Sequence, residues 1–147
     1  GRDEPLVSYN AGVPRNPANP FYGQDKAHNP DGQRFVDRGL GAAVNKPAED
    51  GKFKVPTLRN IARTAPYMHN GYFTTLRGAV AFYNDRDVRQ RCPKDLPEAE
   101  ANRRKCWPAP EVAANVNTDE LGRLGLDERE VDDIVAFLRT LDDGYKP

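Results

Sequence analysis

Residues 53–84, FKVPTLRNIARTAPYMHNGYFTTLRGAVAFYN, bring together several side-chain types that can bind a metal ion or a cofactor. They include the only methionine of the chain, Met68, and one of its two histidines, His69. Half of the six tyrosines are also here: Tyr67, Tyr72 and Tyr83. The pairs Pro-Thr, Ala-Pro and Asn-Gly predict turns between the apolar residues. We therefore expect this stretch to form one wall of a ligand-binding site.

A short amphipathic helix is predicted at the end of this stretch. Thr74 or Thr75 can cap it, because a threonine hydroxyl accepts a hydrogen bond from a backbone N–H of the first turn. Apolar side chains then follow the i, i+3, i+4, i+7 spacing of one helix face: Leu76, Ala79, Val80 and Tyr83. This phase directs Tyr83 toward the interior.

The composition predicts a single domain that needs more than its own apolar core. The chain has 147 residues, the length of one ordinary domain. Only 37% of them are hydrophobic, whereas 13 prolines and 12 glycines favour loops. Six phenylalanines, six tyrosines and one tryptophan argue against disorder. We expect a loop-rich fold that is completed by a cofactor, a metal ion or a partner chain.

Charge and hydropathy argue against two kinds of partner. The formal net charge is zero, and no long basic run directs the chain to nucleic acid or to an anionic membrane. No apolar run approaches the roughly 18 residues that a membrane span needs. The sequence therefore predicts neither a nucleic-acid partner nor a membrane span.

The two cysteines, Cys92 and Cys106, enclose a polar segment without a CxxC or CxxCH pattern. A disulfide that closes this loop is the simplest interpretation, and two free thiols are the alternative. If the disulfide forms, the protein is expected to be periplasmic or secreted, because disulfides persist in oxidising compartments.

The N-terminal part of the chain is predicted to contain little regular structure. Residues 1–30 are rich in Asn-Pro pairs and predict an extended arm over the surface, anchored by Val13, Phe21 and Tyr22. Residues 31–44 allow a short helix that ends at glycine. Residues 57–63 allow one or two helical turns, with Thr57 as the cap.

The C-terminal part contains the strongest helix signal. Residues 126–141 carry an apolar stripe, and Asp127 with Glu130 forms an N-terminal cap signature. Residues 85–117 predict an irregular loop insertion in which Trp107 closes over the core as a lid, and residues 118–124 predict a short helical turn. These patterns favour an all-α, loop-rich fold with a few short helices and a C-terminal helix.

The sequence supports neither a hydrolase active site nor a zinc site. The only serine, Ser8, lies in the N-terminal arm, and there is no GxSxG motif for a catalytic triad. Cysteine, histidine and carboxylate side chains form no cluster at zinc-ligand spacing. A carbonyl-rich bend at residues 64–66 could supply ligands to calcium, which accepts backbone oxygens.

Haem is the cofactor whose axial ligands match the side chains of residues 67–83. Methionine sulfur, histidine nitrogen and tyrosine oxygen all bind haem iron, which makes Met68, His69 and Tyr83 candidates. Each has a second interpretation. Met68 could pack in the core, His69 could stabilise a turn, and Tyr83 could be a buried aromatic whose hydroxyl finds a partner. Residue types alone leave these alternatives open.

The run of residues 55–84 closely resembles the C-terminal haem domain of bacterial di-haem cytochrome c peroxidases and their MauG-type relatives. Other segments agree in the same order: GVPRNPANPFY (12–22), DRGLG (37–41), CWPAPEV (106–112) and VDDIVAFLRTL (131–141). The resemblance covers nearly the whole chain. It implies a class I cytochrome c-like domain over residues 31–147, an oxidoreductase function and a c-type haem.

The resemblance also implies roles for individual residues. Tyr83 matches the distal axial ligand of this haem, which is methionine in the peroxidases and tyrosine in MauG-type members. Met68 matches a position where relatives often carry phenylalanine, which favours packing, next to the recurrent His-(Asp/Asn)-Gly that includes His69. Arg59 is expected near a haem propionate. Thr64 and Pro66 match the carbonyls that bind calcium in the family.

The sequence departs from the family at the haem attachment motif. CxxCH is absent from the 147 residues, so haem c is expected to be attached through a segment or chain outside this sequence. The chain is then expected to be a fragment or a split subunit. Its expected partners are the CxxCH-bearing segment or an N-terminal haem domain, together with a small redox protein as electron donor. The peroxide site belongs to the N-terminal haem, so no catalytic residue is expected here.

Two functions follow from this sequence. The first is an electron-transfer haem domain of a di-haem peroxidase or a MauG-like oxidoreductase, with Tyr83 as an axial ligand of a six-coordinate haem. The second is a haem-less structural or assembly subunit that retains the cytochrome scaffold. The joint presence of Arg59, His69 and Tyr83 favours the first, because a haem-less scaffold has no chemical need for all three.

Overall fold

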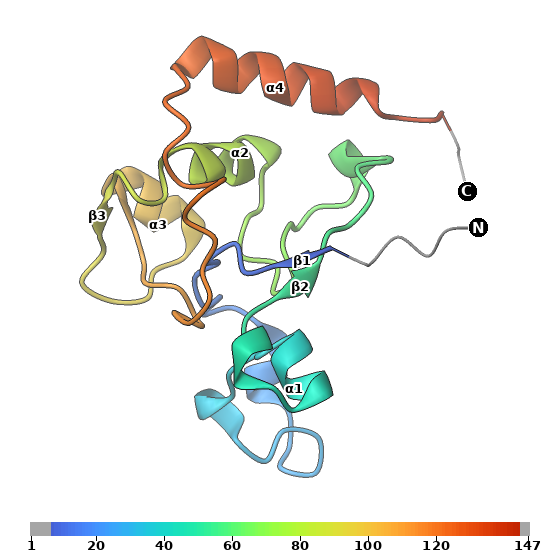
Figure 1. Ribbon diagram of the computed structural model, residues 1–147, viewed down its shortest axis with the longest axis vertical. Helices are drawn as coiled ribbons and strands as arrows, with labels where there is room; N and C mark the ends of the chain where they lie inside the picture. The colour runs from blue at the N-terminus through green and yellow to red at the C-terminus, as the bar shows by residue number, and fades with distance from the viewer. Residues whose placement is uncertain (1–6, 145–147) are drawn as a thin grey trace.

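Helices α2 and α4 pack against each other in the computed structural model, which describes residues 7–144. Helix α2 spans Leu76–Asp85 and helix α4 spans Glu128–Thr140 (Figure 1). Their contact buries Val80, Val131 and Val135, with Leu76, Leu126, Ile134 and Leu138 beside them. These are apolar positions that the helical spacing predicts, so burial of two apolar faces holds the helices together.

Both helices begin at capping residues that the sequence predicts. The Thr75 hydroxyl accepts a hydrogen bond of 3.0 Å from the Gly78 N–H. At α4, the Asp127 side chain accepts from the Glu130 N–H, and the Glu130 carboxylate accepts from the Asp127 N–H. Such caps satisfy first-turn donors and each stabilises a helix by about 1 kcal/mol. The predicted starts of both helices are confirmed.

The remaining elements are short. Helix α1 spans Leu40–Val44 and helix α3 spans Glu98–Arg103. Turns of 3₁₀ helix lie at Pro20–Gly23, Gly32–Arg34, Pro47–Glu49 and Ile61–Arg63. Strand β1 (Ser8–Tyr9) pairs antiparallel with β2 (Phe53–Lys54), and β3 (Gln90–Arg91) pairs parallel with β4 (Cys106–Trp107). Within residues 7–144, no helix is long and apolar enough to cross a membrane.

The all-α prediction is not confirmed, because two pairs of short strands accompany the helices. The prediction that residues 85–117 are wholly irregular is wrong, since they contain α3 and both strands of one pair. Each strand is two residues long and forms through contacts with a distant segment. A local sequence pattern cannot reveal such pairing.

The single helix predicted over residues 31–44 is wrong. The chain instead makes a 3₁₀ turn at Gly32–Arg34, and α1 begins only after Gly39. Gly39 has a φ of 55°, and a Cβ at this position would lie 2.4 Å from the backbone oxygen of Lys52. A sharp turn against a neighbouring backbone therefore replaces the helix, and only glycine fits there.

Residues 57–63 form one helical turn, within the one or two predicted, whereas residues 118–124 do not form the predicted turn. The Thr57 hydroxyl accepts from the Arg59 N–H two residues on, and this local turn delays the helix until Ile61–Arg63. Residues 118–124 form bends without a helix. There the Gly122 N–H donates to the Tyr83 oxygen at 2.7 Å, so tertiary hydrogen bonds use backbone groups that a helix would need.

The core is aromatic. Phe73, Phe82 and Trp107 have no exposed surface, and their ring centroids lie 5.0–5.8 Å apart. The Trp107 indole N–H donates to the Asp85 carboxylate at 2.7 Å. Trp107 therefore packs down as predicted, but it lies at the centre of the core and is not a lid over it.

The described part of the predicted N-terminal arm, residues 7–30, is fixed to the rest of the domain. It contributes β1, and isolated bridges join Asn10 to Val116 and Pro14 to Pro110. Of the three predicted anchors, Val13 and Tyr22 are buried and Phe21 is half-buried. Residues 1–6 of the arm lie outside the described residues.

Cys92 and Cys106 form the predicted disulfide, with their Cα atoms 5.1 Å apart. It closes a loop with a sequence separation of 14 residues next to the β3–β4 pair. Both residues are buried against the aromatic core. The bridge therefore fixes the loop that carries Trp107.

Replacing both Cys92 and Cys106 with alanine is expected to lower the free energy of unfolding by about 3 kcal/mol, because the unfolded chain regains the entropy of an open loop of this length. Guanidinium unfolding followed by circular dichroism measures the change. Chemical reduction of the wild-type protein serves as the control and should cause a similar loss. Equal unfolding midpoints with and without reductant would contradict the prediction.

Candidate functional site

Tyr83 lies in the last turn of α2 and is half-buried, as the helix phase predicts. Its hydroxyl donates a hydrogen bond to the Met68 sulfur, with 3.6 Å between oxygen and Sδ. Burial raises the pKa of Tyr83, and the nearby Arg86 guanidinium opposes this to a smaller extent. The phenol is therefore neutral at physiological pH, and this bond leaves the lone pairs of its oxygen available.

A tight turn presents Met68 to Tyr83. Met68 has a φ of 69°, a left-handed conformation that costs a non-glycine residue about 1–2 kcal/mol. The turn is closed on both sides, because the Tyr67 N–H donates to the Phe73 oxygen at 2.7 Å and the Gly71 N–H donates to the Met68 oxygen at 3.2 Å. Both Met68 and Tyr83 pack against the aromatic core.

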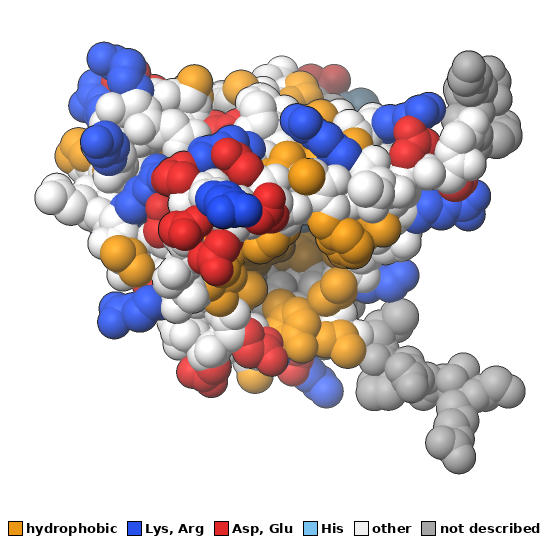
Figure 2. Space-filling model, turned by 90° about the horizontal axis from the view of Figure 1, so that it is seen from above, with side chains coloured by type: hydrophobic (Ala, Val, Ile, Leu, Met, Phe, Trp, Pro, Cys, Tyr) orange, Lys and Arg blue, Asp and Glu red, His pale blue; other side chains and the backbone are white. Residues whose placement is uncertain are grey.

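Exposed apolar side chains lie along the β1–β2 pair and its continuation. Tyr9 opposes Phe53, and two residues further along the pair the Val55 N–H donates to the Val7 oxygen at 3.0 Å. Opposed residues of an antiparallel pair share one face. Val7, Tyr9, Val55 and Leu58 are each 40–50% exposed. In the view from above, hydrophobic side chains border a hollow in the surface (Figure 2). Such an apolar surface indicates a place where a ligand or a partner binds.

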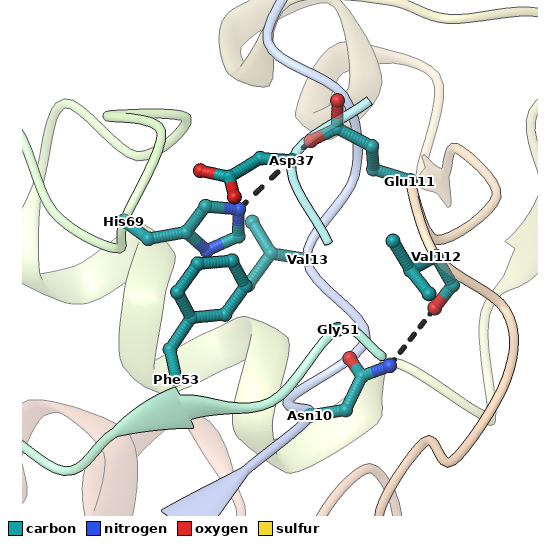
Figure 3. A pocket seen from close by; sticks show the side chains of 8 residues that line it. All are labelled: Asn10, Val13, Asp37, Gly51, Phe53, His69, Glu111 and Val112. Atoms are coloured by element: carbon teal, nitrogen blue, oxygen red, sulfur yellow. Dashed lines mark hydrogen bonds and ion pairs between the residues drawn. The ribbon is translucent and has the colours of Figure 1, made fainter. Parts of the chain in front are cut away.

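His69 points into a small pocket on the other side of its turn. Its ring stacks on Phe53 with centroids 3.6 Å apart, and its Nε2 lies 3.9 Å from a Glu111 oxygen (Figure 3). The His69 side chain is only 15% exposed. The structure thus joins His69 to Glu111, whereas Met68 and Tyr83 contact each other.

Glu111 is a buried carboxylate that joins three segments of the chain. Besides His69, it accepts from the Tyr22 hydroxyl at 3.1 Å and from the Asn70 side-chain amide at 3.4 Å. Burial alone would raise the pKa of Glu111, but the contacts with these three residues outweigh burial and lower it. Burial and the Glu111 charge together raise the pKa of Tyr22 to about 12. This cluster fixes the N-terminal arm to the turn that carries Met68.

The role of Glu111 was not predicted from the sequence. It lies in the segment CWPAPEV, 42 residues after His69 and 89 residues after Tyr22. No periodicity links such distant positions. The one feature that could have drawn attention to it is a single charged residue in an otherwise apolar, proline-containing segment, because glutamate is rarely buried unless it is paired.

Arg59 lies at the surface near the C-terminal end of α4. Its side chain is 70% exposed, and its Nε donates to the Asp143 carboxylate at 2.7 Å. The adjacent Asn60 N–H donates to the Leu141 oxygen at 2.8 Å. Arg59 is thus held close to the exposed Leu58 with its guanidinium accessible to an anionic group.

Thr64 and Pro66 lie on an exposed bend. The Thr64 hydroxyl donates to the Ile61 oxygen at 3.2 Å. Within residues 7–144, no described donor reaches the carbonyl oxygens of Thr64 or Pro66. The same part of the chain contains no group of three or more histidine, cysteine or carboxylate side chains that could hold a metal ion. A cation at the bend would therefore depend on backbone oxygens.

The sequence is similar to a methylamine utilisation protein, MauG of Paracoccus denitrificans. The two are 49% identical over 120 residues, which cover 79% of this chain and 30% of MauG. The chain belongs to the MauG and di-haem cytochrome c peroxidase family. Another member, the cytochrome-c peroxidase IdrP1 of Denitromonas iodatirespirans, is 33% identical over 153 residues, covering 93% of this chain and 34% of IdrP1. The chain spans about a third of the length of these relatives.

Solved structures of the family agree. A MauG-like protein associated with microbial copper homeostasis has a TM-score of 0.66 and 26% identity, and the match covers 97% of this chain and 36% of that one. The di-haem peroxidase BthA from Burkholderia thailandensis has a TM-score of 0.57 and 32% identity, covering 93% and 33%. No protein-family model matches the chain.

Proposed function

We propose that this chain is the C-terminal, electron-transfer haem domain of a c-type di-haem peroxidase or MauG-like oxidoreductase, and that Tyr83 is an axial ligand of its haem iron. The observation that carries the proposal is the half-buried Tyr83 hydroxyl, whose hydrogen bond goes to a thioether. A weak acceptor leaves the phenol oxygen free to bind a stronger partner.

The surroundings of Tyr83 fit a haem. Phenol oxygen and thioether sulfur are both established ligands of haem iron. The exposed apolar side chains of Val7, Val55 and Leu58 suit the faces and edge of a porphyrin. When bound, haem supplies reversible one-electron chemistry at its iron. The apolar side chains of Val7, Val55 and Leu58 would help to exclude water from a haem bound here.

Tyr83 has to release its hydroxyl proton in order to bind iron as a phenolate. The positive charge of Arg86 lowers the pKa of Tyr83 and so favours this ionised form, against the effect of burial. A phenolate oxygen favours higher oxidation states of iron than a thioether does, since methionine ligation raises the reduction potential. A tyrosine ligand at Tyr83 therefore favours a haem that stores oxidising equivalents, as in MauG-type proteins, over a high-potential haem that is readily reduced to the ferrous state.

Other residues are assigned supporting roles. The accessible Arg59 guanidinium can exchange its Asp143 partner for a haem propionate, because a propionate ends in a carboxylate like that of Asp143. His69, joined to Glu111, holds the turn that presents Met68. The carbonyls of Thr64 and Pro66 suit a calcium ion, which accepts backbone oxygens.

The proposal includes partners outside this sequence. A segment or chain that carries CxxCH would attach the haem, an N-terminal haem domain would hold the peroxide site, and a small redox protein would donate electrons. The disulfide between Cys92 and Cys106 supports a periplasmic or secreted location, because such bonds persist in oxidising compartments.

Replacing Tyr83 with phenylalanine in the haem-loaded protein tests the proposal. We expect loss of the tyrosinate-to-iron signals in the resonance Raman and absorption spectra, and a higher reduction potential of that haem, because the oxygen ligand is gone. Tyr67→Phe is the matched control, since Tyr67 is a buried tyrosine of the same stretch, and it should leave the spectra unchanged.

Two results would contradict the proposal in different ways. If Tyr83→Phe leaves the spectrum of the haem unchanged, Tyr83 is not an iron ligand. If the native protein has no Soret absorbance, the chain is instead a structural or assembly subunit that retains the cytochrome scaffold.

A further inference from the structure

The contact between Tyr83 and Met68 places two different iron-ligand types side by side. The phenol oxygen and the thioether sulfur are 3.6 Å apart, although the residues are 15 positions apart in sequence. Met68 is the only methionine of the chain. Its sulfur is thus brought to the one place where the proposed function requires an iron ligand.

Core packing alone does not account for the position of Met68. Its backbone is in the left-handed region, where glycine or asparagine is normally found and a methionine costs stability. A residue held in such a conformation points to a role beyond filling space. Leucine or phenylalanine would fill similar apolar space against the core without a sulfur atom, yet here the sulfur itself contacts the Tyr83 hydroxyl.

We propose that Met68 is an alternative axial ligand of the haem iron, whose sulfur binds the iron when the Tyr83 oxygen does not. This inference rests on the proposed function. The new bond forms by donation of a sulfur lone pair to the iron, so no proton is released and no electron is transferred. Binding of Tyr83, by contrast, forms an oxygen–iron bond and releases the hydroxyl proton to solvent.

The chemistry of the two side chains supports such an exchange. A methionine side chain is unbranched and flexible, so its sulfur can move by about a bond length without moving the backbone. The turn around Met68 is fixed on both sides by backbone hydrogen bonds, which keeps the side chain on the Tyr83 side. A soft thioether also favours reduced iron more than a phenolate does.

Four forms of the haem-loaded protein test the proposal: wild type, Tyr83→Phe, Met68→Leu and the double variant. Near-infrared magnetic circular dichroism detects thioether ligation, and electron paramagnetic resonance reports the spin state of the ferric iron. Tyr83→Phe should stay six-coordinate and low-spin and gain the thioether-to-iron charge-transfer band. The double variant should lose that band and turn high-spin, while Met68→Leu should keep the tyrosinate signals of wild type.

The outcomes separate this inference from the proposed function. A high-spin Tyr83→Phe protein without the thioether band, equal to the double variant, would overturn the role of Met68 and leave Tyr83 as the ligand. Absence of tyrosinate signals in wild type would instead overturn the proposed function. Far-ultraviolet circular dichroism of all four proteins should be the same, so that a loss of the band reports ligation and not misfolding.

Discussion

Replacing Arg86 with leucine is expected to lower the free energy of unfolding by about 3–5 kcal/mol. Arg86 follows α2 directly, and its guanidinium has no exposed surface. It pairs with Asp87 and donates to the backbone oxygens of Ala11 and Asn117, both at 2.8 Å. Leucine fills part of the same volume but removes the main partner of the Asp87 carboxylate and the donor to three backbone carbonyls, those of Ala11, Asn117 and Leu121, and such groups are costly to leave unpaired.

Guanidinium unfolding of the haem-loaded protein, followed by circular dichroism, measures this effect. Arg91→Leu is the matched control, because Arg91 approaches the same Asp87 carboxylate at 3.5 Å while its side chain is 45% exposed. Exposed ion pairs contribute about 1 kcal/mol or less, so the control should lose little. A loss below 1 kcal/mol for Arg86→Leu would show that the buried guanidinium does not hold these segments together.

The effect of Arg86→Leu should extend to Tyr83. The Tyr83 backbone oxygen accepts from Gly122, and the segment around Gly122 is held by Arg86 through Asn117 and Leu121. Loss of the guanidinium frees that segment and removes the positive charge that lowers the pKa of Tyr83. The tyrosinate signals should therefore weaken before the protein unfolds.

The sequence predicted the parts of the fold that depend on local signals. Helix α2 begins at Thr75 and α4 begins at Asp127 because their caps and apolar spacing lie within a few residues of each other. The inward direction of Tyr83 followed from the same spacing. The disulfide between Cys92 and Cys106 followed from the fact that the chain has only two cysteines.

The rest of the fold depends on contacts between distant segments. Gly39 ends the predicted helix because its neighbour is the Lys52 backbone, 13 residues on. Within the candidate site, the contact of Met68 with Tyr83 requires a left-handed residue that no pattern indicates. The contact between His69 and Glu111 likewise forms only when residues 106–112 fold back over the turn that carries Met68 and His69.

Truncating Trp107 to alanine is expected to lower the free energy of unfolding by about 3–5 kcal/mol. The indole is fully buried and contacts the rings of Phe73 and Phe82. Its N–H donates to the Asp85 carboxylate, which also pairs with Arg89. Alanine leaves a cavity at the centre of the aromatic core and removes one donor from the half-buried Asp85 carboxylate, so both packing and hydrogen bonding are lost.

Trp107→Phe separates these two contributions. Phenylalanine retains most of the ring contacts but not the N–H, so a loss of about 1–2 kcal/mol is expected from the unpaired Asp85 oxygen and the smaller ring. Phe137→Ala is the control for a surface aromatic, because Phe137 is 60% exposed on α4, and it should change stability by about 0.5 kcal/mol or less. Urea unfolding of the oxidised, haem-loaded protein measures all three.

The Trp107 variants should also affect the Tyr83 site. The Phe82 ring centroid lies 5.3 Å from that of Trp107 and 6.5 Å from that of Tyr83, so Trp107→Ala should alter the tyrosinate signals, whereas Phe137→Ala should not. Equal losses of stability for Trp107→Ala and Phe137→Ala would mean that Trp107 does not stabilise the core, and unchanged tyrosinate signals in Trp107→Ala would mean that the core does not support the Tyr83 site.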